Sequence, residues 1–176
     1  PDATALASFS DVDLGTFWKT LQAQVEQANL PELSKGLEQL STGLETKLGI
    51  NLDQIAASLG GEVGFVLTLD NDKLVTLPAP NGGRIEFPEP ALALVFKVTD
   101  DKVFNRFDAL LQNNKQVVRE DKGNLKLRSM PLPFPFPVRP TLAYNGEYLF
   151  LATSDKLVQK MLDVKGGGKG LKSNAE

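Results

Sequence analysis

Two stretches of the chain share one order of residue types, and this repeat constrains the fold more than any other sequence feature. Residues 61–70 read GEVGFVLTLD and residues 146–155 read GEYLFLATSD, so Gly, Glu, Phe, Thr and Asp match at equal offsets. Upstream, residues 5–21 and 94–110 each read as a strand, an acidic cap and a helix. The pattern indicates two divergent copies of a strand–helix–insert–strand unit. The alternative is a chance likeness, since short amphipathic strands carry little unique sequence.

The two units differ in their inserts. The first unit spans about residues 4–70 and its insert reads as leucine-rich helices within residues 32–59. The second unit spans about residues 91–163 and its insert reads as a hairpin. Between the units, the Pro- and Gly-rich residues 78–90 predict a linker with a short extended piece at residues 84–87. This order of helices and hairpins predicts one α+β domain over residues 1–176, with an antiparallel or mixed sheet and helices packed on one face.

Short polar residues and glycines mark where several elements begin or turn. A side-chain oxygen before a helix can accept a hydrogen bond from a free backbone N–H group. Glycine tolerates the left-handed backbone that tight hairpins need. The resulting predictions are a helix cap at Asp11 or Asp13, a helix cap at Asn51, a turn over residues 70–73 and hairpin turns over residues 121–124 and at Asn145-Gly146.

The C-terminal text GGGKGLKS, residues 166–173, raises the question of a phosphate-binding loop. Such a loop follows a strand and opens a helix, whereas these glycines follow a predicted helix. Lys169 is also followed by Gly170 rather than by Ser or Thr. We therefore predict a helix stop and a flexible linker over residues 165–176. Because the chain starts at Pro1 rather than Met, we expect it to be a fragment of a longer protein.

The composition removes several kinds of chemistry. The chain has neither Cys nor His, which excludes thiol nucleophiles, imidazole bases and zinc sites built on those side chains. The sequence DND at residues 70–72 begins like a calcium loop but lacks its later glycine and acidic ligand. Two pairs of adjacent carboxylates lie where a helix cap or a turn needs an acceptor, so they do not by themselves indicate an acid–base pair. Two adjacent Ser–Lys pairs have no sequence context that supports catalysis. The four pairs are Asp100-Asp101, Glu120-Asp121, Ser34-Lys35 and Lys172-Ser173. We expect no cofactor, no metal and no catalysis.

The charge pattern bears on possible partners. The 19 basic and 22 acidic residues are mixed along the chain and give a net charge of −3. Nucleic-acid binding needs clustered Lys and Arg, so this balance argues against it. No apolar run approaches the roughly 18 residues of a membrane-spanning helix, so we expect no transmembrane segment in this fragment.

The proline-rich residues 130–140, MPLPFPFPVRP, offer the one candidate interaction site. Alternating prolines force an extended path and remove backbone donors, so this segment cannot be a central strand. Phe134, Phe136 and Arg139 are the candidate residues for contact with a ligand or a protein partner. The competing and favoured reading is a stiff connector whose phenylalanines fill the core or cover a sheet edge.

Several stretches of the sequence resemble a known bacterial family. These are SLGGEV at residues 58–63, PALALVFKV at residues 90–98 with the acidic-capped helix that follows, and NGEYLFLATS at residues 145–154 with its helix and glycine linker. They resemble domain-of-unknown-function family 3352. The resemblance implies an extracytoplasmic protein, periplasmic or envelope-associated, and gives no catalytic signature. The proline-rich segment is not part of the pattern.

Three functions follow as hypotheses. The leading one is a non-catalytic binding or scaffold module of the bacterial envelope, with an unknown protein or an apolar ligand as partner. The second is a carrier that holds an apolar ligand between the leucine-rich helices of residues 32–59 and the sheet. The third is a hydrolase that uses carboxylates or a Ser–Lys pair.

Overall fold

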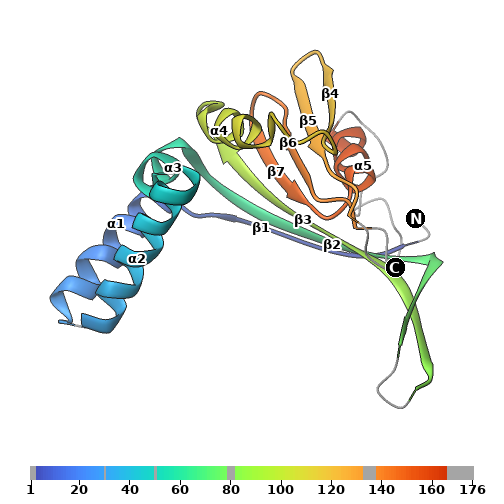
Figure 1. The fold of residues 1–176 in the computed structure, drawn as a ribbon, viewed down its shortest axis with the longest axis horizontal. Coiled ribbons are helices and arrows are strands. Elements are labelled where there is room, and N and C mark those ends of the chain that lie inside the picture. The colour runs from blue at the N-terminus through green and yellow to red at the C-terminus, as the bar shows by residue number, and fades with distance from the viewer. Residues whose placement is uncertain (1–2, 30, 50, 79–81, 133–137, 166–176) are drawn as a thin grey trace.

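The central element is a seven-stranded sheet in the order β1-β2-β3-β7-β6-β5-β4, in which all neighbours are antiparallel (Figure 1). The computed structural model describes residues 3–29, 31–49, 51–78, 82–132 and 138–165. The strands are β1 (Ala3–Asp11), β2 (Leu59–Pro78), β3 (Arg84–Val98), β4 (Val118–Lys122), β5 (Leu125–Ser129), β6 (Thr141–Tyr144) and β7 (Tyr148–Ala152). The helices are α1 (Leu14–Gln27), α2 (Pro31–Leu48), α3 (Leu52–Ser58), α4 (Lys102–Leu111) and α5 (Asp155–Lys165). The α+β class is confirmed, and the sheet is antiparallel.

The two predicted units each contain a strand that leads into a helix and a later strand that returns antiparallel beside it. In the first, β1 leads into helices and β2 returns antiparallel beside it. In the second, β3 leads into α4 and β7 returns antiparallel beside it, after the β4–β5 hairpin and β6. The long hairpin of β2 and β3 joins the units. A common origin of the two units stays a prediction.

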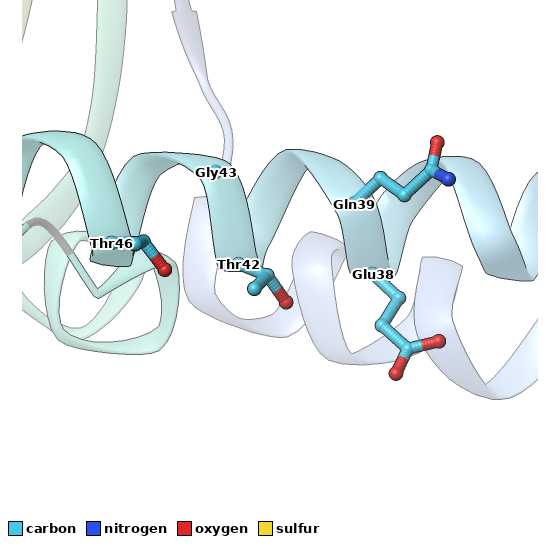
Figure 2. A pocket seen from close by; sticks show the side chains of 5 residues that line it. All are labelled: Glu38, Gln39, Thr42, Gly43 and Thr46. Carbon is cyan, nitrogen blue, oxygen red and sulfur yellow. The ribbon is translucent and has the colours of Figure 1, made fainter.

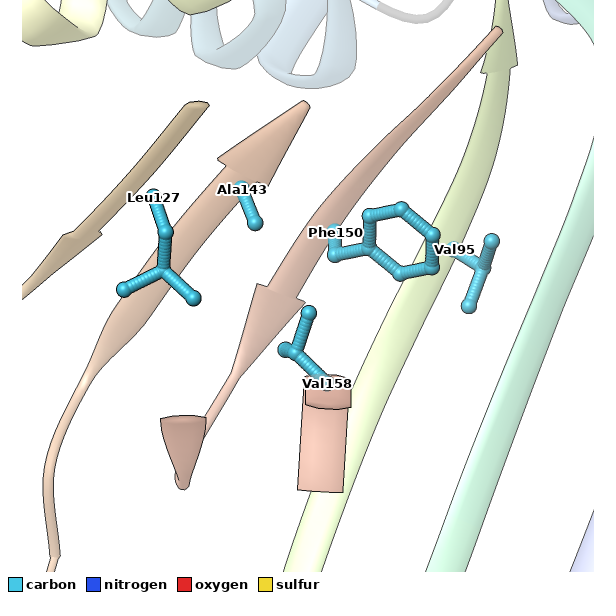
Figure 3. Close-up of a cluster of buried hydrophobic side chains, with 5 residues drawn as sticks. All are labelled: Val95, Leu127, Ala143, Phe150 and Val158. Atoms are coloured by element: carbon cyan, nitrogen blue, oxygen red, sulfur yellow. The ribbon is translucent and has the colours of Figure 1, made fainter. Parts of the chain in front are cut away.

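One core lies between α5 and the second half of the sheet. Val158 of α5 is fully buried against four strand residues, Val95, Leu127, Ala143 and Phe150. The strand register places these four side by side, because Ala143 pairs with both Leu127 and Phe150 and Phe150 pairs with Val95. Figure 3 shows the five side chains of this cluster, which join β3, β5, β6 and β7 to α5. Each large apolar side chain contributes about 1.5–3 kcal/mol by leaving water.

A second core lies on the opposite face of the same strands. Phe104 of α4 is buried against Leu142 and Leu149 and contacts the Tyr144 ring at a centroid distance of 5.9 Å. Since consecutive strand residues point to opposite faces, Leu142 and Ala143 place α4 and α5 on different sides. The expectation that helices cover only one face is wrong for this pair. The reason is that β6 and β7 are apolar at consecutive positions, so both of their faces need cover.

The leucine-rich helices do not lie over the sheet. Figure 1 shows α1 and α2 as a helical pair at one end of β1 and β2, pointing away from the strands. Asp13 caps α1 by accepting the Thr16 N–H at 2.9 Å. The indole Nε1 of Trp18 donates a hydrogen bond to Asp53 Oδ1 at 2.9 Å, and this bond connects α1 to α3. Phe17 remains 56% exposed, so this helical pair buries only part of its apolar surface.

The turn predicted at residues 70–73 is wrong, and the extended piece predicted at residues 84–87 within the linker is the beginning of a longer strand. β2 continues through a register shift between Asp70 and Leu74, and β3 already begins at Arg84.

The two prolines of β3 fit the hydrogen-bonding pattern of the sheet. Thr153 N–H donates to Leu92 C=O, so even-numbered residues of β3 direct their backbone groups toward β7. Pro88 and Pro90 are even-numbered and lie beyond the end of β7. Their missing N–H groups therefore cost no hydrogen bond within the sheet.

Candidate functional site

The sheet has an apolar area on the face that carries α4, and no helix in the described part of the chain covers it. Two rows of paired residues cross the strands here. Leu94 pairs with Leu151 and Phe65, while Leu67 pairs with Leu92 and Leu6. Leu6 is 57% exposed, and Leu92, Leu94 and Leu151 are each 38–39% exposed. We call this area the leucine face; its residues are Leu6, Phe65, Leu67, Leu92, Leu94 and Leu151.

A groove of about 340 Å³ lies where the leucine face meets the end of α4. Leu92 and Leu94 of β3 line it together with Leu142 and Leu151 of the neighbouring strands. Leu111, Val117 and Met130 add to its apolar lining. The volume falls within the range of about 300–1,000 Å³ that is typical of small-molecule pockets. The groove is open on one side, so it suits either an apolar ligand or an apolar segment of a protein.

The charged side chain that borders the groove is not available to a ligand. Arg128 of β5 is only 6% exposed and donates to both oxygens of Asp108, at 2.8 and 3.0 Å. It also donates to Asp121 Oδ1 at 2.6 Å, and its guanidinium lies 5.3 Å from the centre of the Phe104 ring. The hydrogen bond to Asp108 raises the pKa of Arg128, and the hydrogen bond from Arg128 lowers the pKa of Asp121. This network holds α4 against β4 and β5.

A second polar cluster crosses β2, β3 and β7. Glu62 forms an ion pair with Lys97 and accepts a hydrogen bond from the Tyr148 hydroxyl at 3.1 Å. The hydrogen bond from Lys97 to Glu62 raises the pKa of Lys97. Burial raises the pKa of Tyr148, so its phenol stays protonated near neutral pH. A protonated phenol is a hydrogen-bond donor rather than a nucleophile, and the cluster ties three strands together.

The candidate residues of the proline-rich segment have different outcomes. Phe134 and Phe136 lie outside the described residues. Arg139 is described, and its Nη1 donates to Asp155 Oδ2 at 2.6 Å, in the first turn of α5. Its backbone N–H donates to Thr153 C=O at 2.9 Å, just past the end of β7. Arg139 thus attaches the segment to α5 and β7, and its role in binding a partner stays a prediction.

The adjacent carboxylates each face a cation. Asp100 pairs with Lys102 at 2.6 Å and Asp101 with Lys126 at 3.4 Å. Glu120 lies 3.8 Å from Lys122, and Asp121 binds Arg128. The hydrogen bond from Lys102 lowers the pKa of Asp100, which favours the ionised form over that of a general acid. Within the described ranges, no three acidic side chains gather closely enough to hold a metal ion.

Two other hollows offer less for binding. Figure 2 shows the first, whose lining residues Glu38, Gln39, Thr42, Gly43 and Thr46 all come from one helix, α2. A single helix surface encloses nothing. The second, of about 250 Å³, lies between α3 and α4. The Arg106 side chain occupies the space beside Gly49 in this hollow, since a Cβ at Gly49 would collide with the Arg106 guanidinium.

The sequence did not indicate the leucine face. Residues 91–98 read as a central strand because they are almost wholly apolar, and a central strand is expected to be buried on both faces. The available signal was the recurrence of large apolar residues at alternate positions, namely Phe65 and Leu67, Leu92 and Leu94, and Leu151. Alternation tells which residues share a face, but it does not tell whether a helix covers that face.

Comparison with known proteins identifies the family. No curated protein and no solved structure matches the chain. Among the described residues, no helix is long and apolar enough to cross a membrane. A model of a family described as a protein of unknown function (DUF3352) matches residues 1–127. The match covers the first unit and the beginning of the second, including β2 and β3. Because it covers well over half of the chain, the protein belongs to this family of unknown function.

Proposed function

We propose that the protein is a non-catalytic binding or scaffold module of the bacterial envelope that receives an apolar partner on the leucine face. The observation that carries the proposal is the exposure of paired leucines at the centre of the sheet, beside a groove. Contiguous exposed apolar area on a folded domain marks interaction surfaces. The bacterial and extracytoplasmic parts of the proposal rest on the sequence resemblance alone.

A carrier of an apolar ligand is the second candidate, supported by the volume of the groove. Its site differs from the expected one, because α2 packs beside α1 and α3 rather than over the sheet. The hydrolase has the least support. The hydrogen bonds that Asp100 and Asp121 accept from cations favour their ionised forms.

A dye-binding measurement tests the leucine face as a binding site. Anilinonaphthalene sulfonate fluoresces on apolar surfaces, and its titration gives a dissociation constant. Leu94→Ser removes a side chain from the floor of the groove. We expect it to weaken dye binding about tenfold, since the apolar contact of one leucine is worth about 1.5 kcal/mol or more.

Leu74→Ser is the matched control. Leu74 is 59% exposed and lies in the part of β2 beyond the register shift, opposite Pro88 and away from the groove. Its dye binding should equal that of the unchanged protein. Equal dye binding by all three proteins would contradict the proposed site. Displacement of the dye by dodecanoate would support the carrier, and no displacement would support a polypeptide partner.

A further inference from the structure

Among the described residues, β1 is the edge strand of the sheet that lacks a run of charged side chains. β1 and β4 are the two edge strands in the sheet order. β4 has the sequence VREDK, with charged side chains at four consecutive positions. β1 has the sequence ATALASFSD, in which Asp11 is the one charged residue. Charges on an edge strand keep other strands from pairing with it, so β4 is protected and β1 is not.

The strand register identifies the backbone groups that β1 presents outward. Val12 N–H donates to Gly61 C=O at 2.6 Å, in register with the pairing of Asp11 and Glu62. Hydrogen-bonded and non-hydrogen-bonded pairs alternate along an antiparallel ladder. Even-numbered residues of β1 therefore bond to β2, and the N–H and C=O groups of odd-numbered residues, including Ala7 and Phe9, point away from the sheet.

Side-chain exposure agrees with an edge that awaits a partner strand. Leu6 and Phe9 are 57% and 59% exposed, although they lie within a nine-residue strand. The Phe9 ring lies over Gly64 of β2, where a Cβ would come within 2.3 Å of the ring. Close approach of this kind is expected of a non-hydrogen-bonded pair. The edge thus combines a regular row of backbone donors and acceptors with apolar side chains.

We propose that β1 pairs antiparallel with β1 of a second copy of this chain, around a two-fold axis at Ala7. This register pairs Ala7 with Ala7 and Ala5 with Phe9, so each outward N–H group meets an outward C=O group. The axis stands perpendicular to the sheet, and the two sheets become one. The leucine faces of both copies then lie on the same side and form one apolar surface. The pairing does not depend on the proposed binding function.

Charge selects this partner and this direction. In the antiparallel register Asp11 lies opposite Ala3 of the other copy, and the two Asp11 residues are about 27 Å apart along the strands. That separation exceeds the Debye length of about 8–10 Å, so their repulsion is screened. A parallel pair would place the two carboxylates side by side. Pairing of β1 with β4 of another copy would set four charged residues against an apolar strand and would build an open chain.

A cysteine cross-linking experiment tests the register, because the chain has no cysteine of its own. In Ala7→Cys the two Cα atoms of the dimer should lie about 5.5 Å apart, which suits a disulfide. In the control, Ser10→Cys, they should lie about 20 Å apart. Under mild oxidation of the full chain, we expect Ala7→Cys to form a covalent dimer and Ser10→Cys to stay largely uncross-linked.

Sedimentation of the unchanged chain gives the second measurement. We expect its mass to rise from monomer to dimer with concentration, and Ala7→Pro, which lacks the outward N–H group, to stay monomeric with an unchanged circular dichroism spectrum. A chain that remains monomeric into the submillimolar range would overturn the proposal. Equal cross-linking of both cysteine variants would also overturn it, since random collisions would then explain the disulfide.

Discussion

Arg128 is a cation with almost no contact with water, and its two carboxylate partners are partly in water. Arg128 is 6% exposed, whereas the Asp108 and Asp121 side chains are 26% and 60% exposed. Removing the arginine leaves carboxylates that water can solvate, and Asp108 keeps Arg119 at 3.4 Å. Removing the carboxylates leaves a buried charge without a counter-ion, which is the costlier change.

We therefore expect Arg128→Met to lower the free energy of unfolding by about 1–3 kcal/mol and the double variant Asp108→Asn, Asp121→Asn to lower it by about 3–5 kcal/mol. Urea unfolding of the three proteins measures both values. The reverse order would show that the contacts of the guanidinium, including the one with the Phe104 ring, matter more than the cost of a buried charge without a counter-ion.

At the scale of elements, α3 is short enough to depend on its cap. It spans Leu52–Ser58, and Asn51 Oδ1 accepts the Gln54 N–H at 3.1 Å. We expect Asn51→Ala to cost about 1 kcal/mol in urea unfolding, and Asn51→Gly only a few tenths, because glycine is a tolerated cap. If neither variant lowers the free energy of unfolding, the Asn51 side chain does not stabilise the helix.

The elements that the sequence predicted are those with local causes. The caps at Asp13 and Asn51 and the glycine turns at Gly123 and Gly146 are confirmed, and both glycines have positive φ. Each depends on hydrogen bonds or backbone angles within a few residues. The stretch at residues 70–73 looked like a turn for equally local reasons, but the strand continues past it, because residues 74–78 pair with β3 again after the register shift. A partner strand distant in sequence outweighs turn propensity.

At the scale of the whole molecule, the candidate site exists because α1 and α2 do not pack over the leucine face of the sheet. The α+β class could be predicted because the order of helices and hairpins limits the possible layers. The leucine face could not be predicted, because the same leucines in residues 92–94 would be buried if α2 lay over the sheet. Whether these leucines are buried or exposed depends on the direction in which α1 and α2 extend from the sheet.

The acid stability of the molecule combines carboxylates from separate regions. The hydrogen bond from Lys102 lowers the pKa of Asp100, and the hydrogen bond from Arg128 lowers the pKa of Asp121. Between the folded pKa and the unfolded value of about 4, the unfolded chain binds more protons, so stability rises with pH in this window. The stabilisation is complete above about pH 4 and disappears as the pH falls through the folded pKa values.

Urea midpoints measured from pH 7 down to pH 2 should therefore hold steady and then fall below about pH 4. Asp121→Asn has no carboxylate to protonate at this position, so its midpoint should be lower at pH 7 and should fall less steeply in acid. Parallel pH profiles for the two proteins would mean that Asp121 keeps an ordinary pKa. In that case the bond to Arg128 would not contribute to stability, and Asp108 alone would neutralise the buried guanidinium.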